Sequence, residues 1–254
     1  MKILVFADLH LWTGDVHSTM EGHPTGNAFR AHDAVEKHSP DVVVFCGDTV
    51  QSEHLPFLSR IQRNIVGGDI PIVSCLGNHE FWGRTWESTL EMVSGKTHGV
   101  HLLDTRGAVV IDGVNFTGGM LFFDGSLKSW PDQRVTPWGG WNDKYITNID
   151  IDYLELNRYY TDYIRGTIRK DIPNVLVTHH VPHESLNWYS QEPGNYNYYS
   201  GMKDFLSELE TSSDVENRCF CGHTHRPMES TVGNWKCSNI GSDYGDVRYQ
   251  LLEL

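Results

Sequence analysis

Short apolar runs alternate with amphipathic segments along the first third of the chain. The runs are rich in β-branched residues and lie at Lys2–Ala7, Val42–Cys46 and Pro71–Leu76. Continuous runs of this kind are typical of parallel strands that are buried on both faces. Between them, residues 27–38 and 52–65 carry apolar residues at helical spacing, and Gly67-Gly68 ends the second segment. The order β-α-β-α-β predicts a parallel layer with right-handed crossovers.

The rest of the chain continues with further short elements. Helical spacing recurs over residues 85–93, 149–169 and 202–209. Strand-like segments lie at residues 100–103, 108–111, 114–117, 175–177, 218–221 and 247–254. Asp112-Gly113 and Gly233-Asn234 are signals for two-residue hairpin turns. We expect an α/β fold, a four-layer α/β/β/α sandwich with mixed central sheets flanked by helices, and a single domain over residues 1–254.

Three stretches depart from this regular pattern. Residues 11–26 form a polar insertion, residues 124–148 are rich in tryptophan, proline and glycine, and residues 183–201 are rich in tyrosine. Each leaves the predicted sheet near its carboxyl edge, where binding loops gather in α/β proteins. We expect all three to surround the functional site.

Composition and charge exclude several classes of protein. The formal charge is −13, which disfavours a broad face for duplex nucleic acid because both surfaces are negative. Only six apolar residues precede Asp8 within the first segment, too few for a signal peptide, and no run approaches the roughly 20 apolar residues of a membrane span. Five cysteines, mostly in strand-like runs, are typical of reduced, buried thiols in a cytoplasmic protein.

Five short polar blocks each follow an apolar run. They are Asp8-Leu9-His10, Gly47-Asp48, Gly77-Asn78-His79-Glu80, His179-His180 and Gly222-His223-Thr224-His225. Carboxylate, imidazole and amide oxygen together suit hard-to-borderline metal ions. The blocks therefore predict a hydrolase with two divalent metal ions.

Local geometry supports this interpretation. Asp8 and His10 would share a face if the strand stayed extended through both residues. Gly47 permits the sharp turn that lifts Asp48 above the sheet. The two carboxylate oxygens of Asp48 could then bridge two ions.

The blocks resemble those of the calcineurin-like metallophosphoesterase superfamily, and the resemblance extends from Asp8 to His225. It implies the same four-layer sandwich and the hydrolysis of phosphate esters. It assigns to the first ion Asp8, His10, Asp48 and His225, and to the second ion Asp48, Asn78, His179 and His223. Asp48 is then the bridging ligand.

The resemblance also places the histidine of the third block, His79, against the phosphate or the leaving group. A histidine suits general acid catalysis near neutral pH, so we expect His79 to protonate the leaving oxygen and Glu80 to orient a neighbouring ligand. Two ions would acidify a bridging water, polarise the phosphoryl oxygens and neutralise charge in the transition state. Manganese is favoured because the site is oxygen-rich, and Fe, Zn, Co and Ni also fit the donors. Asn239–Ser242 resembles a family segment that closes the sheet beneath the site.

Departures from the patterns of individual subfamilies narrow the substrate. No arginine follows Gly47-Asp48, as one does in protein Ser/Thr phosphatases, and Gln51 stands where purple acid phosphatases have a tyrosine ligand. We expect a phosphodiesterase or nucleotide phosphoesterase that acts on a small phosphate ester through a metal-bridging hydroxide. The alternatives are a phosphomonoesterase, a nuclease on short single strands, and a non-catalytic interaction module of the same fold. Candidate substrate-binding residues are Arg84, His180, Arg226 and Trp188, and an aromatic loop residue such as Trp188 could stack on a nucleoside.

Overall fold

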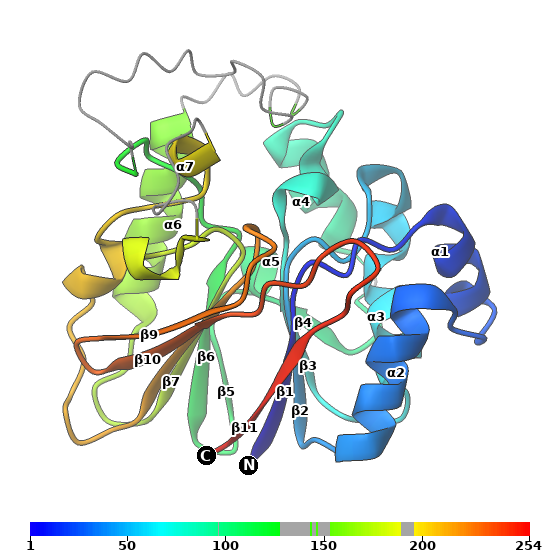
Figure 1. Cartoon of the computed structure of the whole chain (residues 1–254), viewed down its shortest axis with the longest axis horizontal. Coiled ribbons are helices and arrows are strands. Elements are labelled where there is room, and N and C mark those ends of the chain that lie inside the picture. Colours follow the sequence, from blue (N-terminus) through cyan, green and yellow to red (C-terminus); the bar gives the residue numbers. More distant parts are fainter. Residues whose placement is uncertain (96, 128–142, 144–145, 147–152, 189–195) are drawn as a thin grey trace.

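Two β-sheets lie face to face between two layers of helices (Figure 1). The computed structural model describes residues 1–95, 97–127, 143, 146, 153–188 and 196–254. The predicted four-layer α/β/β/α sandwich with mixed sheets is confirmed.

The first sheet has the strand order β11-β1-β2-β3-β4. Its strands are β1 (Lys2–Phe6), β2 (Val42–Cys46), β3 (Ile72–Cys75), β4 (Val100–Leu102) and β11 (Tyr249–Glu253). The first four are parallel, and β11 runs antiparallel to β1. On its outer side lie α1 (Thr13–Met20), α2 (Gly26–His38) and α3 (Leu58–Val66), with α1 packed against the other two (Figure 1).

The second sheet has the strand order β5-β6-β7-β8-β10-β9. Its strands are β5 (Val109–Ile111), β6 (Val114–Gly119), β7 (Asn174–Thr178), β8 (Asn217–Cys221), β9 (Met228–Val232) and β10 (Trp235–Asn239). β6, β7, β8 and β10 are parallel, and the edge strands β5 and β9 are antiparallel to their neighbours. The long helix α6 (Tyr153–Thr167) covers its outer face (Figure 1).

Shorter elements complete the described part of the chain. The helices are α4 (Trp86–Val93), α5 (Leu103–Arg106) and α7 (Tyr196–Tyr199). The 3-10 turns are η1 (Ser52–Phe57), η2 (Asn78–Phe81), η4 (Glu184–Leu186) and η6 (Phe205–Glu208). Of these, α4 and α7 lie at the upper end of the molecule in Figure 1.

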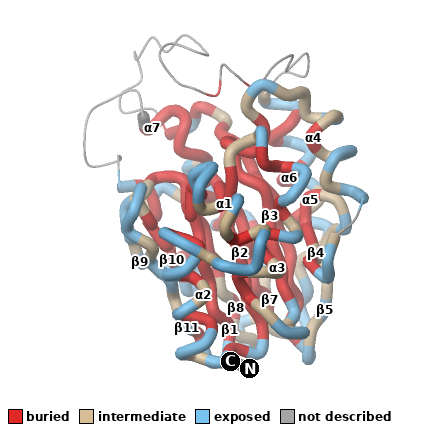
Figure 2. Tube along the Cα trace, turned by 90° about the vertical axis from the view of Figure 1, so that its right-hand side faces the viewer, coloured by how far each residue is buried: buried red, intermediate tan, exposed pale blue. Residues whose placement is uncertain are grey.

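Strand alternation divides the apolar residues between two cores. Ile3 and Val5 of β1 point between the two sheets, whereas Leu4 and Phe6 point toward the helices. All five residues of β2 are buried, as expected for a strand covered on both faces. The buried residues accordingly follow the strands through the centre of the molecule, and exposed residues occupy the periphery (Figure 2).

Several predicted boundaries were wrong. Residues 11–26 are not an irregular insertion, because α1 lies within them and buries Val16 and Thr19. The helix predicted over residues 52–65 is divided into η1 and α3, since Pro56 lacks the N–H that a continuing α-helix needs. The helix predicted over residues 202–209 is only the 3-10 turn η6, and the chain turns into α5 at Leu103, which had been assigned to a strand.

Both predicted hairpins are confirmed. Asp112 and Gly113 have φ values of 47° and 80°, the left-handed pair that a type I′ turn requires. The second turn joins β9 to β10 through Gly233. At the far end of β10, the side-chain amide of Asn239 donates a hydrogen bond to Thr224 of the last polar block.

Candidate metal centre

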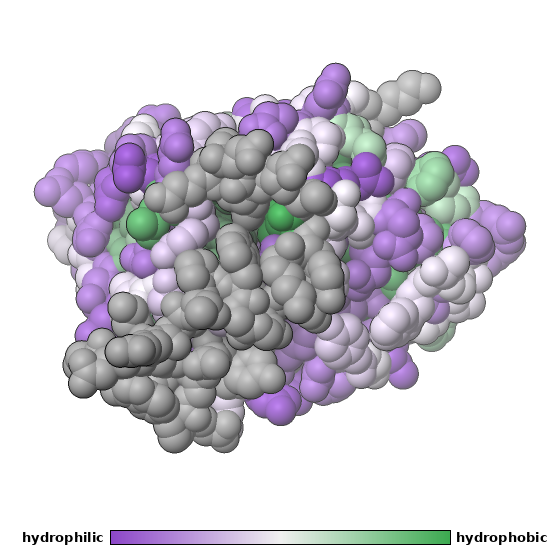
Figure 3. All heavy atoms as spheres, turned by 90° about the horizontal axis from the view of Figure 1, so that it is seen from above, coloured by the Kyte–Doolittle hydropathy of each residue, from purple (hydrophilic) through white to green (hydrophobic). Residues whose placement is uncertain are grey.

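The predicted metal ligands converge from both sheets at one end of the sandwich. Asp8, His10, Asp48 and Asn78 follow β1, β2 and β3 of the first sheet, and His179, His223 and His225 follow β7 and β8 of the second sheet. Figure 3 looks onto this end, and hydrophilic residues make up most of its visible described surface. The ligands lie beneath that surface, since His223 is 8% exposed and the exposed fractions of Asp8, Asp48 and His179 are at most 1%.

The backbone of the ligand segments is strained. Five of the seven predicted ligands have positive φ, namely Asp8 (54°), His10 (44°), Asp48 (48°), His223 (70°) and His225 (53°). Non-glycine residues in this region cost about 1–3 kcal/mol each and cluster at functional sites. Asp8 and His10 therefore come together through two left-handed residues, and the prediction that they share the face of an extended strand was wrong.

Two glycines allow the close packing of the loops around the carboxylate of Asp48. Gly47 has a φ of 78°, and a Cβ there would lie 2.7 Å from Nδ1 of His179. A Cβ at Gly77 would lie 2.1 Å from Oδ1 of Asp48. Neither position can accept a side chain without a shift of the ligands, which explains the glycine in each block.

One group of donors corresponds to the predicted first ion. Nε2 of His10 lies 3.0 Å from Nε2 of His225 and 3.7 Å from Oδ2 of Asp48. Nε2 of His225 lies 3.8 Å from Oδ1 of Asp8. Oδ2 of Asp8 is buried and has no hydrogen-bond partner among the described residues. This unpartnered oxygen and the facing ring nitrogens fit a cation placed among them.

A second group lies directly beside it. Oδ1 of Asn78 is 2.8 Å from Nε2 of His179 and 3.1 Å from Nδ1 of His223. Oδ2 of Asp48 is 3.3 Å from Nε2 of His179. Asp48 thus borders both groups, as a bridging ligand must. The donors again fit a divalent ion, and the assignment of the seven residues as ligands stays a prediction.

Partners outside the cluster fix which ring nitrogen faces inward. Nδ1 of His179 lies 3.0 Å from the carbonyl of Cys46, and Nδ1 of His225 lies 3.3 Å from Asp243. Nε2 of His223 lies 3.2 Å from the carbonyl of Tyr199. A ring nitrogen that donates to a carbonyl or carboxylate leaves the other one free as a ligand.

Asn78 is oriented in the same way by a residue that the sequence analysis did not single out. Its Nδ2 donates to Oδ1 of Asp143 over 2.7 Å, and the indole nitrogen of Trp82 donates to the same oxygen over 3.0 Å. Asp143 is fully buried. Because the amide nitrogen is taken by this carboxylate, the amide oxygen of Asn78 turns toward the histidines.

His79 and Glu80, the predicted general acid and its neighbour in the chain, both lie beside Asp48. Nε2 of His79 lies 3.7 Å from Oδ2 of Asp48, and its Nδ1 contacts the amide of Gln51. Its ring lies tilted against that of Trp82, with ring centroids 3.6 Å apart. The carboxylate of Glu80 accepts from the backbone N–H groups of Asp48, Val50 and Gly77. Glu80 therefore holds the loop that carries Asp48, and among the described residues it forms no hydrogen bond with the side chain of a predicted ligand.

The cluster is electrostatically uneven. Burial raises the pKa of Asp8 to about 6. Burial also opposes ionisation of Asp48, but the nearby imidazoles, His179 first, hold its pKa well below the usual value. Burial lowers the pKa of His179, and the charges of Asp48 and Asp8 outweigh it and raise that pKa to about 10. The position between His179 and Asp48 thus favours positive charge, which a metal ion supplies when it displaces the proton.

The comparisons with known proteins give the family. The model of the calcineurin-like phosphoesterase family matches residues 1–227. The chain belongs to this family. Members depend on two metal ions and hydrolyse phosphate esters, so this calcineurin-like phosphoesterase is a hydrolase that acts on ester bonds. A comparison with curated proteins gives no match.

Solved structures agree in fold. The chain is similar to the phosphopantetheinyl hydrolase of Mycobacterium tuberculosis, with a TM-score of 0.59 and 15% identity, over 99% of this chain and 96% of that one. It is also similar to a dimetal phosphatase of Danio rerio, with a TM-score of 0.54 and 12% identity, over 95% of this chain and 87% of that one. At these identities the likeness concerns the fold. No helix among the described residues is long and apolar enough to cross a membrane.

The candidate substrate-binding residues of this calcineurin-like phosphoesterase lie in different settings. Arg84 donates to the carbonyl of Ser52, and Arg226 lies 3.5 Å from Asp243. His180 is fully buried, with its ring 4.1 Å from that of His223. In this arrangement His180 is shielded from substrate and packs behind a ligand.

Trp188 is 36% exposed and follows η4. Residues 189–195 lie outside the described residues, whereas Tyr198 and Tyr199 of α7 are buried. Most of residues 124–148, including their three tryptophans, also lie outside the described residues.

The sequence analysis missed two exposed aromatic residues of the site. The ring of Tyr244 stacks on His10 with a centroid distance of 4.5 Å and meets His225 at 5.1 Å. Trp12 lies beside Tyr244, with ring centroids 6.1 Å apart. Neither residue belongs to a periodic apolar pattern in the sequence. Only the closeness of Trp12 to the first polar block could have indicated a role.

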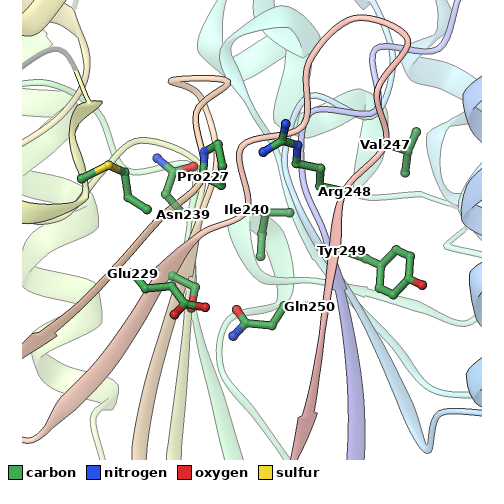
Figure 4. A pocket seen from close by; sticks show the side chains of 10 residues that line it. Pro227, Glu229, Asn239, Ile240, Val247, Arg248, Tyr249 and Gln250 are labelled. Carbon is green, nitrogen blue, oxygen red and sulfur yellow. The ribbon is translucent and has the colours of Figure 1, made fainter.

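The cavity shown in Figure 4 lies apart from these ligands. It has a volume of about 470 Å³ and opens between β9, β10 and the segment leading into β11. Glu229 of β9 and Gln250 of β11 point into it. None of its lining residues is a predicted ligand, so it is separate from the candidate metal centre.

Proposed function

We propose that this chain is a phosphodiesterase or nucleotide phosphoesterase that uses two divalent ions, with Asp8, His10, Asp48 and His225 holding one and Asp48, Asn78, His179 and His223 the other. The observation that supports the pair of ions is the convergence of both donor groups on Asp48. Bound there, the ions supply an acidified water and positive charge for the phosphoryl oxygens. Manganese suits the carboxylate and amide oxygens of this donor set, and Fe, Zn, Co and Ni fit its oxygens and imidazoles as well.

The distribution of fixed positive charge favours a diester over a monoester. A phosphodiester carries one negative charge at neutral pH, whereas a monoester carries nearly two. Within the described structure no lysine or arginine pairs with Asp8 or Asp48, and the nearby Arg226 is already matched by Asp243. A dianion would call for a further cationic group such as the bidentate arginine of phosphate sites. Its absence from the described cluster suits the single charge of a diester.

His79 serves as the general acid in this proposal. Hydrolysis adds the oxygen of water to phosphorus, breaks one P–O ester bond and leaves an alkoxide that must gain a proton. Burial lowers the pKa of His79 below 6.5, and a phosphate anion bound beside the ring raises it again. Gln51 on Nδ1 and Trp82 against the ring keep Nε2 directed at the cluster, so the proton is available at the atom that faces the leaving oxygen.

The preference is tested with two chromogenic esters. The purified protein is loaded with Mn²⁺, its metal content is confirmed by elemental analysis, and kcat/KM is measured on bis(p-nitrophenyl) phosphate and p-nitrophenyl phosphate. We expect the diester to be preferred by at least about tenfold, which corresponds to about 1.4 kcal/mol. Preference for the monoester would make the chain a phosphomonoesterase, and failure on both esters with two ions bound would overturn the assigned site.

A further inference from the structure

A hydrogen-bonded turn holds Tyr244 beside the candidate metal centre. The backbones of Asp243 and Asp246 exchange two hydrogen bonds of 3.1 and 2.8 Å across it. The backbone N–H of Tyr244 donates to Oδ1 of Asp243 over 2.8 Å, and Arg30 donates to the carbonyl of Gly245 over 2.9 Å. The turn is therefore held at both its base and its tip, and the ring of Tyr244 stays against His10 without depending on a flexible loop.

Trp12 joins this ring from the opposite end of the sequence. Trp12 is 58% exposed and Tyr244 is 50% exposed. Side chains that remain so open gain only part of the free energy that burial of an aromatic ring supplies. Core packing therefore does not account for two large rings meeting at the rim of the metal centre, whereas a planar ligand would cover the faces that they leave open.

The two rings lie on a particular side of the site. His10 contacts His79 with ring centroids 4.5 Å apart and contacts Tyr244 at the same separation. Among the described residues no ring contact joins Tyr244 to His79. The rings of Tyr244 and His79 therefore contact His10 without contacting each other, and the aromatic pair lies apart from the proposed general acid. The leaving oxygen must face His79, so a group near Tyr244 is the substituent that stays on phosphorus.

We propose that Trp12 and Tyr244 form a stacking platform for a planar substituent, such as a nucleobase, on the part of the phosphodiester that is retained. This inference rests on the proposed function and makes that substrate a nucleoside 5′-phosphodiester. It assigns the aromatic contact to Trp12 and Tyr244 and not to Trp188. Specificity for the retained group would then be separate from the chemistry at phosphorus.

The test compares two substrates with the same leaving group. Thymidine 5′-(p-nitrophenyl phosphate) and methyl p-nitrophenyl phosphate both release p-nitrophenol, and only the first retains a base. In Trp12→Ala and Tyr244→Ala we expect the ratio of kcat/KM for the thymidine ester to that for the methyl ester to fall by about 5- to 150-fold, the range for loss of one base–aromatic stack. Tyr244→Phe should keep the stack and stay near wild type on both.

A binding readout and a matched control complete the design. The inhibition constant of thymidine 5′-monophosphate should rise in both alanine variants, while that of inorganic phosphate should not change. Tyr159→Ala removes an equally exposed tyrosine (56%) from α6 and should leave both substrates unaffected. Equal losses on the two substrates, no loss on either, or a selective loss only in Trp188→Ala would each overturn the platform. Failure of the wild type on both esters would instead count against the proposed function.

Discussion

Replacing Gly77 with alanine tests how closely the site depends on the packing of its loops. A Cβ at this position lies 2.1 Å from Oδ1 and 2.5 Å from the backbone nitrogen of Asp48, whereas ordinary contact begins at 3.4 Å. The carboxylate could rotate, but the backbone nitrogen moves only with the whole loop. The loop must therefore shift by roughly 1 Å, a displacement that costs about 10²-fold in rate when it misplaces catalytic groups.

The same shift should be visible in metal binding and in stability. Oδ1 of Asp48 also accepts from the backbone N–H of His79 over 3.0 Å, so the variant disturbs the proposed bridge and the proposed acid together. We expect Mn²⁺ affinity to fall by about 10- to 100-fold and overpacking to cost about 1–3 kcal/mol of folding free energy. Titration calorimetry with Mn²⁺, turnover of bis(p-nitrophenyl) phosphate and thermal unfolding measure the three effects.

Gly166→Ala is the matched control. Gly166 lies in α6, and a Cβ there meets no heavy atom within 4 Å. Alanine at a helical glycine should stabilise the fold by roughly 0.5–1 kcal/mol and leave metal binding unchanged. If Gly77→Ala bound Mn²⁺ and turned over as the wild type does, the crowding argument and the position assigned to Asp48 would both be refuted.

Four further outcomes are expected. His79→Ala should keep both ions by elemental analysis and lose about 10²–10⁴-fold in kcat; loss of metal would show that the ligand set is misassigned. Asp48→Ala should lower occupancy at both sites, and loss of a single equivalent would contradict its bridging role. Asp143→Ala frees the amide of Asn78 to turn and should lower the affinity of one Mn²⁺ site by about 10- to 100-fold. An unchanged calorimetric binding isotherm would contradict this. The pKa of His179 is raised to about 10, and a histidine must lose its proton to bind a metal, so Mn²⁺ affinity should increase as pH rises toward 10. Proton release would be measured as a dependence of the binding heat on the buffer. A fall in Mn²⁺ affinity with rising pH would contradict this.

The sheets could be predicted from the sequence because their signal is local. Val42–Cys46 is apolar throughout, and the structure buries all five residues of this strand. Asp112-Gly113 supplied its own turn geometry. The helix α1 within residues 11–26 was not predicted, because it buries only Val16 and Thr19 and two such positions give no detectable helical period. At Pro56 the apolar spacing continued although the α-helix could not.

The candidate site could likewise be predicted only in part from the sequence. The grouping of the polar blocks followed from strand ends meeting at one edge, but the left-handed backbone of Asp8 and His10 has no counterpart in the residue types themselves. Asp143 and Tyr244 lie outside the periodic parts of the sequence, and their contacts with Asn78 and His10 cross 65 and more than 230 positions of the chain. Such contacts depend on tertiary structure, which residue spacing does not encode.

The ligands come from both sheets, and this has a mechanical consequence. Asp8, Asp48 and Asn78 are anchored in the first sheet, and His179, His223 and His225 in the second. An ion held by both sets would be a cross-link through the middle of the sandwich, next to the contacts of His179 with the Cys46 carbonyl and of the His223 N–H with Asp8. Separation of the sheets would then require release of the ions, so metal should protect the amides of β2 and β7 from hydrogen exchange far more than those of the outer helices. The same ions that activate the ester would keep the two halves of the molecule from opening.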